Sequence, residues 1–286
     1  MTAVNNVGSG PLSGVRVLDL SQAIAGPMIG RIFADLGADV VKVEWSNGDI
    51  TNRFGPKVGG ITGVFLHMNA GKRGISVDRT IPGGTDLLLR LADKADVVIE
   101  NFKPGTMEKW GLGYDVLSRD NPGLVMLRLS GFGQTGPMSS QAGFGSVGES
   151  MGGLRYVTGF PDRPPIRPNL SIGDAIAALH GVIGALMALQ GRAVNGGKGQ
   201  VVDVALYEAV FNMMESVLPE YAMFGEVRER AGSSLPGIVP SNTYLSRDGQ
   251  HIVIGANADN IFKRLMHCIA RDDLGDDPFY RGSGRF

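Results

Sequence analysis

The sequence predicts an α/β fold with a mostly parallel sheet, and two observations carry this prediction. Short runs rich in valine, isoleucine and leucine alternate with segments whose apolar residues recur about every 3.6 residues, the period of a helix. The runs are nearly continuous in apolar residues, which is typical of strands buried on both faces. Alternation of this kind indicates successive β-α-β units.

The first half of the chain shows this alternation most clearly. Strands are predicted for VRVLDL (15–20), DVVKVE (39–44), ADVVIE (95–100) and GLVMLRL (123–129). Helical spacing is found in PMIGRIFADLG (27–37) and GGTDLLLRLADKA (83–95). Residues 130–168 are rich in glycine, proline and serine, so we expect a long functional loop region or a set of short helices there.

Two helices are predicted next, at about 172–190 and 204–224, and residues 243–269 have the pattern strand, turn, strand, helix. The predicted organisation is a flexible N-terminus (1–12), a large domain (13–224), a linker (225–240) and a small α+β domain (241–286). We expect this small domain to be incomplete, because the sequence stops inside it.

Composition and charge limit the possible partners. The chain has 286 residues, of which 43% are hydrophobic and 19% charged, a normal balance for a globular protein. A formal net charge of −1 gives no broad positive field, so nucleic acid or an acidic membrane surface is not expected as the main partner. The single cysteine, Cys268, cannot form an internal disulfide, which favours a reducing, cytoplasmic location. No membrane span is expected, since no run reaches about 18 consecutive apolar residues.

Familiar cofactor motifs are either incomplete or absent from the sequence. GFGQTG (131–136) satisfies G-x-G-x-x-G after a strand, but Pro137 and the residues after it show no helical period, which argues against a dinucleotide site. No P-loop, H-E-x-x-H or G-x-S-x-G pattern occurs. No metal site is predicted, because the four histidines are scattered, at positions 67, 180, 251 and 267.

One acidic residue, Asp174, lies in an otherwise apolar or small stretch, PNLSIGDAIAALHGVIGALMAL (168–189). Ser171 to Asp174 matches [ST]-x-x-[DE], so Asp174 could be part of a helix capping box. Alternatively its carboxylate is a reagent at the positive end of the helix. The spacing alone leaves both interpretations open.

The predicted helix that carries Asp174 has two unlike faces. One is an apolar stripe expected to face the core, formed by Ile172, Ile176, Leu179, Ile183 and Leu186. The other is a ridge of small side chains with one acid, formed by Asp174, Ala178, Gly181 and Ala185. A ridge of this kind lets a neighbouring helix, a strand or a ligand approach closely.

Six segments in order resemble the class III CoA-transferases, the family of formyl-CoA transferase, carnitine CoA-transferase and bile-acid-inducible protein F. They are VRVLDLSQAIAGPMIGRIFADLGADVVKVE (15–44), NAGKRGISVD (69–78), DVVIENFKPGTMEKWGLGYDVL (96–117), SGFGQTGP (130–137), IGD (172–174) and GRAVNGGKGQVVDVALYEAV (191–210). The resemblance covers the chain from about Leu12 onward. It implies a Rossmann-like, CoA-binding large domain and a CoA-transferase, with no permanently bound cofactor and with CoA or acyl-CoA as substrate.

The resemblance also implies roles for individual residues. IGD falls where the family has its catalytic aspartate, so Asp174 would attack the acyl-CoA thioester and form first a mixed anhydride and then an aspartyl-CoA thioester. Glycines that leave room for an oxyanion are expected in support, namely Gly152, Gly153 and Gly173. CoA would contact residues of the first β-α turns, namely Ala23, Ala25, Lys72, Arg73, Asn101, Phe102, Met107 and Lys109.

The acceptor is expected to be a small carboxylic acid, with a dicarboxylic acid such as succinate favoured by three nearby arginines, Arg155, Arg163 and Arg167. Two positions depart from formyl-CoA transferase, with Trp45 in place of an arginine and Ile24 in place of a glutamine. Its glycine-repeat loop is also replaced, by GSSLPGIVP (232–240). These departures argue against formyl and oxalate specificity.

Two alternatives remain open within the same family. The α-methylacyl-CoA racemases use the equivalent aspartate as an acid/base opposite a histidine, but Phe144 occupies the corresponding position here, which favours transfer. A truncated, inactive member is the other alternative, because relatives continue beyond the last residue of this sequence. Relatives also form dimers of interlocked chains, so a homodimer is expected.

Overall fold

The structure is a computed structural model that describes residues 9–282. Of the predicted flexible N-terminus, residues 1–8 lie outside the described residues. The remainder of it is tied to the fold, because the Leu12 N–H donates to the Leu36 carbonyl at 3.0 Å.

The chain forms two compact units. The first comprises the described residues up to Leu154 together with Pro168–Glu215, and the second comprises Arg155–Arg167 and the residues from Ser216 onward. The prediction drew its boundary after residue 224 and kept 155–167 in the large domain. In the structure 155–167 pairs with the later segment instead, since the Gly232 N–H donates to the Gly159 carbonyl at 2.9 Å.

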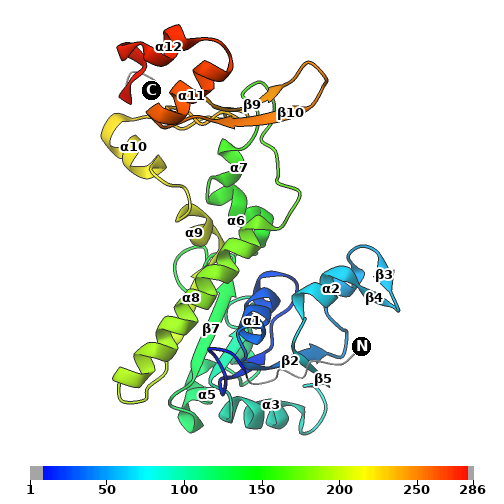
Figure 1. The fold of residues 1–286 in the computed structure, drawn as a ribbon. Coiled ribbons are helices and arrows are strands. Elements are labelled where there is room, and N and C mark those ends of the chain that lie inside the picture. The colour runs from blue at the N-terminus through cyan, green and yellow to red at the C-terminus, as the bar shows by residue number, and fades with distance from the viewer. Residues whose placement is uncertain (1–8, 283–286) are drawn as a thin grey trace. The chain divides into compact units, whose positions relative to one another are not determined.

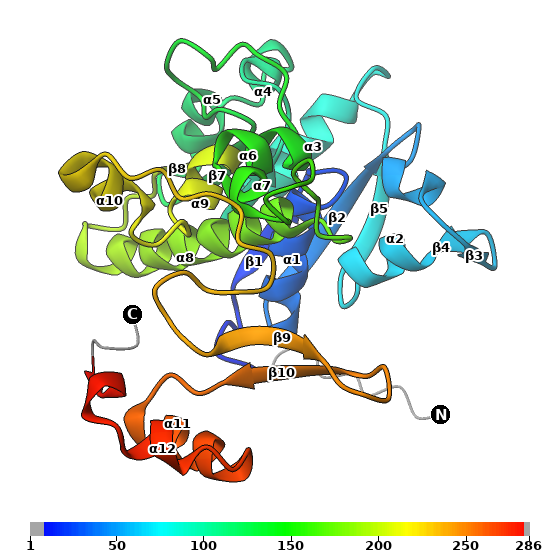
Figure 2. The ribbon, with the colours of Figure 1, turned by 90° about the horizontal axis from the view of Figure 1, so that it is seen from above.

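The first unit is built on a six-stranded parallel sheet with the order β5-β2-β1-β6-β7-β8 (Figures 1 and 2). The strands are β1 (Arg16–Asp19), β2 (Asp39–Trp45), β5 (Arg73–Val77), β6 (Val97–Glu100), β7 (Val125–Ser130) and β8 (Val201–Ala205). The predicted parallel α/β sheet is confirmed. The two strands that the sequence pattern missed, β5 and β8, are the edge strands, and both are largely exposed at their starts.

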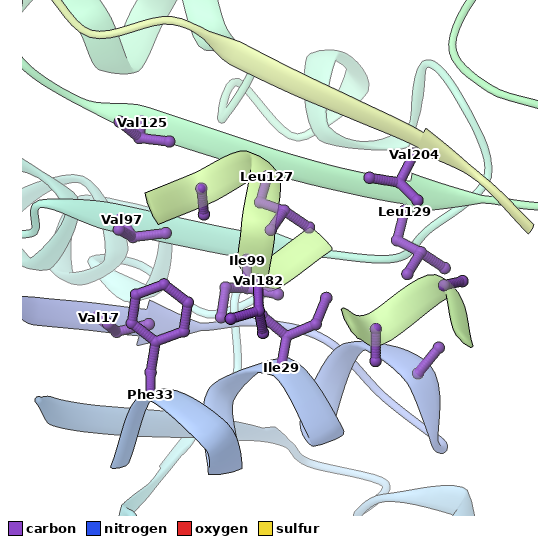
Figure 3. Close-up of a cluster of buried hydrophobic side chains, with 14 of the residues drawn as sticks. Val17, Ile29, Phe33, Val97, Ile99, Val125, Leu127, Leu129, Val182 and Val204 are labelled. Atoms are coloured by element: carbon purple, nitrogen blue, oxygen red, sulfur yellow. The ribbon is translucent and has the colours of Figure 1, made fainter. Parts of the chain in front are cut away.

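Helices cover both faces of this sheet because successive strand residues point to opposite sides. On one face, α1 (Ala25–Asp35) and α8 (Ile172–Val194) pack against the strands, and Ile29, Phe33 and Val182 meet Val97 and its neighbours there (Figure 3). On the other face lie α3 (Gly84–Asp93), α4 (Thr106–Lys109) and α5 (Tyr114–Asp120).

Helix α8 buries its small-residue ridge most deeply, and the predicted core stripe only in part, since Ile176 and Leu186 pack against the core while partly exposed. Leu179 and Ile183, from the expected core stripe, are 50% and 56% exposed, whereas Ala178 and Ala185 are fully buried. A Cβ built on Gly181 would lie 2.9 Å from Ile29 Cδ1, so α1 approaches the helix at its small-residue ridge. Among the described residues α8 is the one helix long and apolar enough to cross a membrane, but here that ridge packs on the sheet.

The remaining elements of the first unit are short. The glycine-rich region 130–168 contains α6 (Gly145–Met151) and α7 (Leu154–Val157). The boundary between the two units follows Leu154, the first residue of α7. Between β2 and β5 in the chain lie η1 (Ile50–Arg53), β3 (Lys57–Val58), β4 (Ile61–Thr62) and α2 (Gly63–Met68). The predicted helix 204–224 is in fact split into α9 (Leu206–Phe211) and α10 (Val217–Phe224), with Glu215 at a positive φ of 51° between them.

The second unit contains the predicted strand, turn, strand, helix order. Strands β9 (Ser241–Leu245) and β10 (His251–Gly255) form an antiparallel hairpin, followed by α11 (Asp259–Cys268), α12 (Asp272–Asp276) and η2 (Pro278–Tyr280) (Figure 2). Helix α10 also belongs to this unit.

Candidate active site

Asp174 lies in the first turn of α8 and is half-buried. The Ser171 side chain, at the N-cap position, makes no capping hydrogen bond. Instead the N–H of Gly173 donates to Oε1 of Glu149, on α6, at 3.2 Å. The serine half of the predicted capping box is therefore not formed, and the cap comes from a different helix.

The carboxyl group of Asp174 lies against the bare backbone of Gly145, the first residue of α6. A Cβ built on Gly145 would fall 2.2 Å from Asp174 Oδ2 and 2.9 Å from Cγ, so no side chain fits at this position without displacing the carboxyl group. The residue before it, Phe144, is the N-cap of α6 and is largely exposed. Phe144, the residue predicted to occupy the position of the racemase histidine, thus directly precedes the glycine that contacts Asp174.

The histidines of the chain are engaged elsewhere. His180, on α8 itself, contacts the Ile176 carbonyl at 2.9 Å and Asn212 Nδ2 at 3.0 Å. The other partners are Arg31 for His67 and Asp272 for His267, while His251 begins β10 in the second unit.

The three glycines predicted to support an oxyanion all have their N–H groups occupied. Gly173 donates to Glu149, Gly152 donates to the Gly148 carbonyl at 2.8 Å, and Gly153 donates to the Ser150 carbonyl at 3.2 Å. Gly152 instead serves packing, since a Cβ there would lie 2.6 Å from Val210 Cγ1. In this structure these glycines let α6 approach α8 and α9 closely.

A cavity of about 490 Å³ opens at the carboxyl ends of β2, β5 and β6, where ligands bind in open parallel sheets. Its apolar wall is an aromatic cluster of Trp45, Phe102 and Trp110, with ring centroids 4.8–6.0 Å apart. Its cations are Arg53 and Arg79, and the Arg79 guanidinium lies 4.3 Å from the Trp110 ring centroid. Sequence reasoning predicted Phe102 but missed both arginines, because neither lies in a segment that carries the resemblance.

The loop between β1 and α1 is held in place next to this cavity. Asn101 accepts from the Gln22 N–H at 2.8 Å and donates to the Gln22 carbonyl at 2.7 Å. Ala23 has a left-handed φ of 65°, which is uncommon for a residue with a side chain, and its N–H donates to Asp49 Oδ1 at 3.3 Å. Asn101 and Ala23, both predicted to bind CoA, thus shape the loop at the cavity wall.

Lys72 does not reach out to meet a phosphate as predicted. Its Nζ lies 2.7 Å from Asp19 Oδ2 and 2.7 Å from the Pro27 carbonyl, and the side chain is 1% exposed. Burial lowers the pKa of the Lys72 ammonium, against the opposing effect of Asp19. Burial alone would raise the pKa of Asp19, but Lys42 and Lys72 outweigh this and hold it below its ordinary value. Lys72 is a buried structural cation under the β1-α1 loop.

The other predicted CoA contacts fall into two groups. Arg73 begins β5, at the amino end of a strand whose carboxyl end lines the cavity, and forms a bidentate pair with Asp39, with Nη2 2.6 Å from Oδ2. Ala25 and Met107 are buried in the core, whereas Lys109 is exposed at the end of α4. The structure therefore does not bring these four residues together around one ligand.

The predicted acceptor-binding arginines Arg155, Arg163 and Arg167 all belong to the second unit, whereas Asp174 belongs to the first. Arg163 is exposed and lies 5.5 Å from the Phe160 ring centroid. Their proposed role toward an acceptor stays a prediction.

Fold and site together define an α/β protein with a nucleotide-sized cavity at the sheet edge and a half-buried carboxylate at a helix start. Residues 12–285 match CoA-transferase family III, and the chain belongs to this family.

Two relatives and two solved structures illustrate the match. The chain is 50% identical over 270 residues to succinyl-CoA–D-citramalate CoA-transferase of Chloroflexus aurantiacus, covering 94% of this chain and 67% of that protein. It is 40% identical to the succinyl-CoA–L-malate CoA-transferase alpha subunit of Chloroflexus aurantiacus, covering 94% of this chain and 64% of the relative. The chain thus spans about two thirds of the length of these relatives.

Among solved structures, a CAIB/BAIF family protein from Brucella suis is 37% identical with a TM-score of 0.85, covering 96% of this chain and 74% of that one. The protein Rv3272 from Mycobacterium tuberculosis is 33% identical with a TM-score of 0.83, covering 97% and 74%.

Proposed function

We propose that this chain transfers CoA from succinyl-CoA, or a closely similar acyl-CoA, to a small carboxylic acid, with Asp174 as the covalent carrier. The observation that carries the proposal is the half-buried Asp174 carboxyl group at the start of α8, lying on the side-chain-free Gly145. The relatives named above, which use succinyl-CoA with citramalate or malate, support a hydroxylated dicarboxylic acid as acceptor.

The proposed reaction begins when a carboxylate oxygen of Asp174 attacks the thioester carbonyl carbon of the donor. The carbon–sulfur bond breaks, CoA leaves as thiolate, and a mixed anhydride joins Asp174 to the acyl group. Thiolate then attacks the aspartyl carbonyl and expels the donor acid, which leaves an aspartyl-CoA thioester. The acceptor carboxylate repeats the first step on this thioester, and thiolate finally attacks the acceptor carbonyl to release acceptor-CoA and free Asp174.

The first step needs help from the protein. An ordinary aspartate titrates near about 3.9 and a thiol near about 8.5, so a weak base must expel a stronger one. The positive end of α8, a helix of 23 residues, favours the negative charge that develops beside its first turn. Anhydride and thioester are both hydrolysed by water, so the half-burial of Asp174 favours transfer over hydrolysis.

We propose the cavity at the ends of β2, β5 and β6 as the binding site for the nucleotide end of CoA. Trp45, Phe102 and Trp110 offer ring faces and edges to the adenine, while Arg53 and Arg79 offer charge to phosphate.

Racemisation by this site is disfavoured. It needs a second acid/base opposite the aspartate. Phe144 directly precedes Gly145, which the Asp174 carboxyl group contacts, and a phenyl ring cannot take or give a proton.

We propose a homodimer as the working form, in the cytoplasm. Leu179, Ile183 and Met187 form a row on α8 that is exposed within this chain, and exposed apolar rows of this kind are typical of protein interfaces. The cytoplasmic location is supported by the lone cysteine, Cys268.

The proposal is tested by incubating the chain with succinyl-CoA, trapping with hydroxylamine and mapping the modified peptide by mass. Hydroxamate is expected on Asp174, and an Asp174→Ala variant is expected to lose both labelling and CoA exchange. Labelling only outside 168–190, or undiminished exchange in Asp174→Ala, would overturn the mechanism. Deuterium uptake at Cα without an acceptor would favour racemisation instead.

A further inference from the structure

Glu149 is a buried carboxylate that sequence reasoning did not single out. It lies on α6, one helical turn after Gly145, and is 0% exposed. Burying a charged side chain is costly unless it is hydrogen-bonded, so a position of this kind needs a reason. The structure gives one partner directly, since Glu149 Oε1 accepts the Gly173 N–H at 3.2 Å.

The backbone of α6 lies so close to the start of α8 that little space is left for a side chain between them. A Cβ built on Gly173 would lie 2.8 Å from Glu149 Cγ and 3.2 Å from the Gly145 carbonyl oxygen. The same face of α6 thus contacts two consecutive residues of α8, with Glu149 on Gly173 and Gly145 on the Asp174 carboxyl group.

The same face of α6 is also fixed against α9, because residues three and four positions apart in a helix lie side by side. A Cβ on Gly148 would lie 2.9 Å from Leu206 Cβ, and one on Gly152 would lie 2.6 Å from Val210 Cγ1, both on α9. Helix α6 therefore cannot move away from α8 without losing its packing on α9. It forms a rigid support for whatever its α8 face holds.

The first N–H groups of any helix lack partners within the helix, and an unpaired first turn frays. Serine at the N-cap usually supplies the partner, but Ser171 does not do so here. Glu149 takes this role from outside the helix, so the direction of the first turn of α8 is set by α6.

We infer that Glu149 is a positioning residue for Asp174. Its hydrogen bond to Gly173 fixes the first turn of α8 so that the Asp174 carboxyl group stays on Gly145, aimed at the thioester. This inference rests on the proposed role of Asp174 as nucleophile. Since Glu149 acts as a hydrogen-bond acceptor, glutamine can replace it, whereas a side chain of similar length without an acceptor cannot.

The test compares Glu149→Gln, Glu149→Met and the exposed neighbour Ser150→Ala in the full chain. For each, the rate of hydroxamate formation on Asp174 and the kcat and KM for succinyl-CoA are measured, with thermal unfolding as a check of folding. Glu149→Met is expected to slow labelling and lower kcat about 10- to 100-fold, as misplacement of a reacting group by about 1 Å does. The KM should change less than about threefold, because the cavity is lined by other segments.

Glu149→Gln and Ser150→Ala are expected to label at close to the unchanged rate. If Glu149→Met does not fold, Glu149→Asp gives the decision, because its carboxylate is one methylene too short to reach Gly173 and labelling should again be slow. Equal labelling rates in all folded variants, or a Glu149→Gln variant as slow as Glu149→Met, would overturn the inference. Absence of labelling in the unsubstituted chain would instead refute the proposed function itself.

Discussion

At the scale of single residues, Lys72 and Arg73 show how two adjacent cations acquire different roles. Lys72 is inside the fold with its Nζ on Asp19, whereas the Arg73 side chain is 65% exposed and pairs with Asp39 at the surface. Removing one partner of a buried pair leaves an uncompensated charge, which does not happen at the surface.

The unfolding free energy should separate these neighbours. Lys72→Met is expected to cost about 3 kcal/mol, the lower end for a broken buried pair, because Asp19 would stay buried with Lys42, 4.0 Å away, as its remaining cation. Arg73→Met is the matched control and should cost less than about 1 kcal/mol. Urea unfolding of both variants measures the difference. Equal losses of unfolding free energy would contradict the burial of the Lys72 side chain against Asp19.

The sequence could not assign this role to Lys72, because its partner Asp19 is 53 residues away. The same limit hid Glu149, which is 24 residues from Gly173 and carries no motif. Asp174 could be singled out as a candidate, since both its position in an apolar stretch and the resemblance are local to the sequence, and its role stays a prediction. Residues that act by contact across the fold leave no such local pattern.

At the scale of elements, the sequence predicted the central strands and the existence of α8, but it did not predict that the small-residue ridge of α8 is its most deeply buried face. Periodicity locates a stripe of large apolar residues and gives no information on which neighbours the helix meets. Here α1 and β7 approach so closely that only small side chains fit between, and a Cβ on Gly181 would meet both Ile29 and Leu127. The larger residues Leu179 and Ile183 are left on the outside of this chain.

Two glycines on α8 test this orientation. Gly181→Ala is expected to cost about 1–3 kcal/mol, because the added methyl group would overpack a filled interface. Gly191→Ala, in the same helix and with open space around it, should stabilise by about 0.5–1 kcal/mol, since alanine is the better helix former. Thermal unfolding in parallel gives both values, and a stabilising Gly181→Ala would mean that α1 and α8 are packed more loosely than described.

At the scale of the whole molecule, the first unit has its cavity and the Asp174 carboxyl group in different places. The cavity is lined from the ends of β2, β5 and β6, while Asp174, the proposed nucleophile, lies where α6, α8 and α9 meet. The resemblance predicted site roles for Asp174 and for Phe102 of the cavity, and both roles stay predictions; it did not point to Arg53 and Arg79, which also line the cavity. Asp174 does not line the cavity. Substitutions at the cavity should therefore change substrate binding and leave the chemical step unchanged.

Arg79 provides the test of that separation. Its guanidinium lies over Trp110 at the cavity wall, so Arg79→Met removes one cation while keeping an apolar stem against the ring. A charge-assisted hydrogen bond to phosphate is worth about 1.5–3 kcal/mol, and 1.4 kcal/mol is a factor of about ten, so the KM for succinyl-CoA should rise at least about tenfold. The rate of hydroxamate formation on Asp174 at saturating donor should stay unchanged. Arg90→Met, an exposed arginine on α3, serves as control and should alter neither quantity. A fall in the saturated labelling rate of Arg79→Met with no change in KM would place Arg79 in the chemical step and remove the cavity from the binding of CoA.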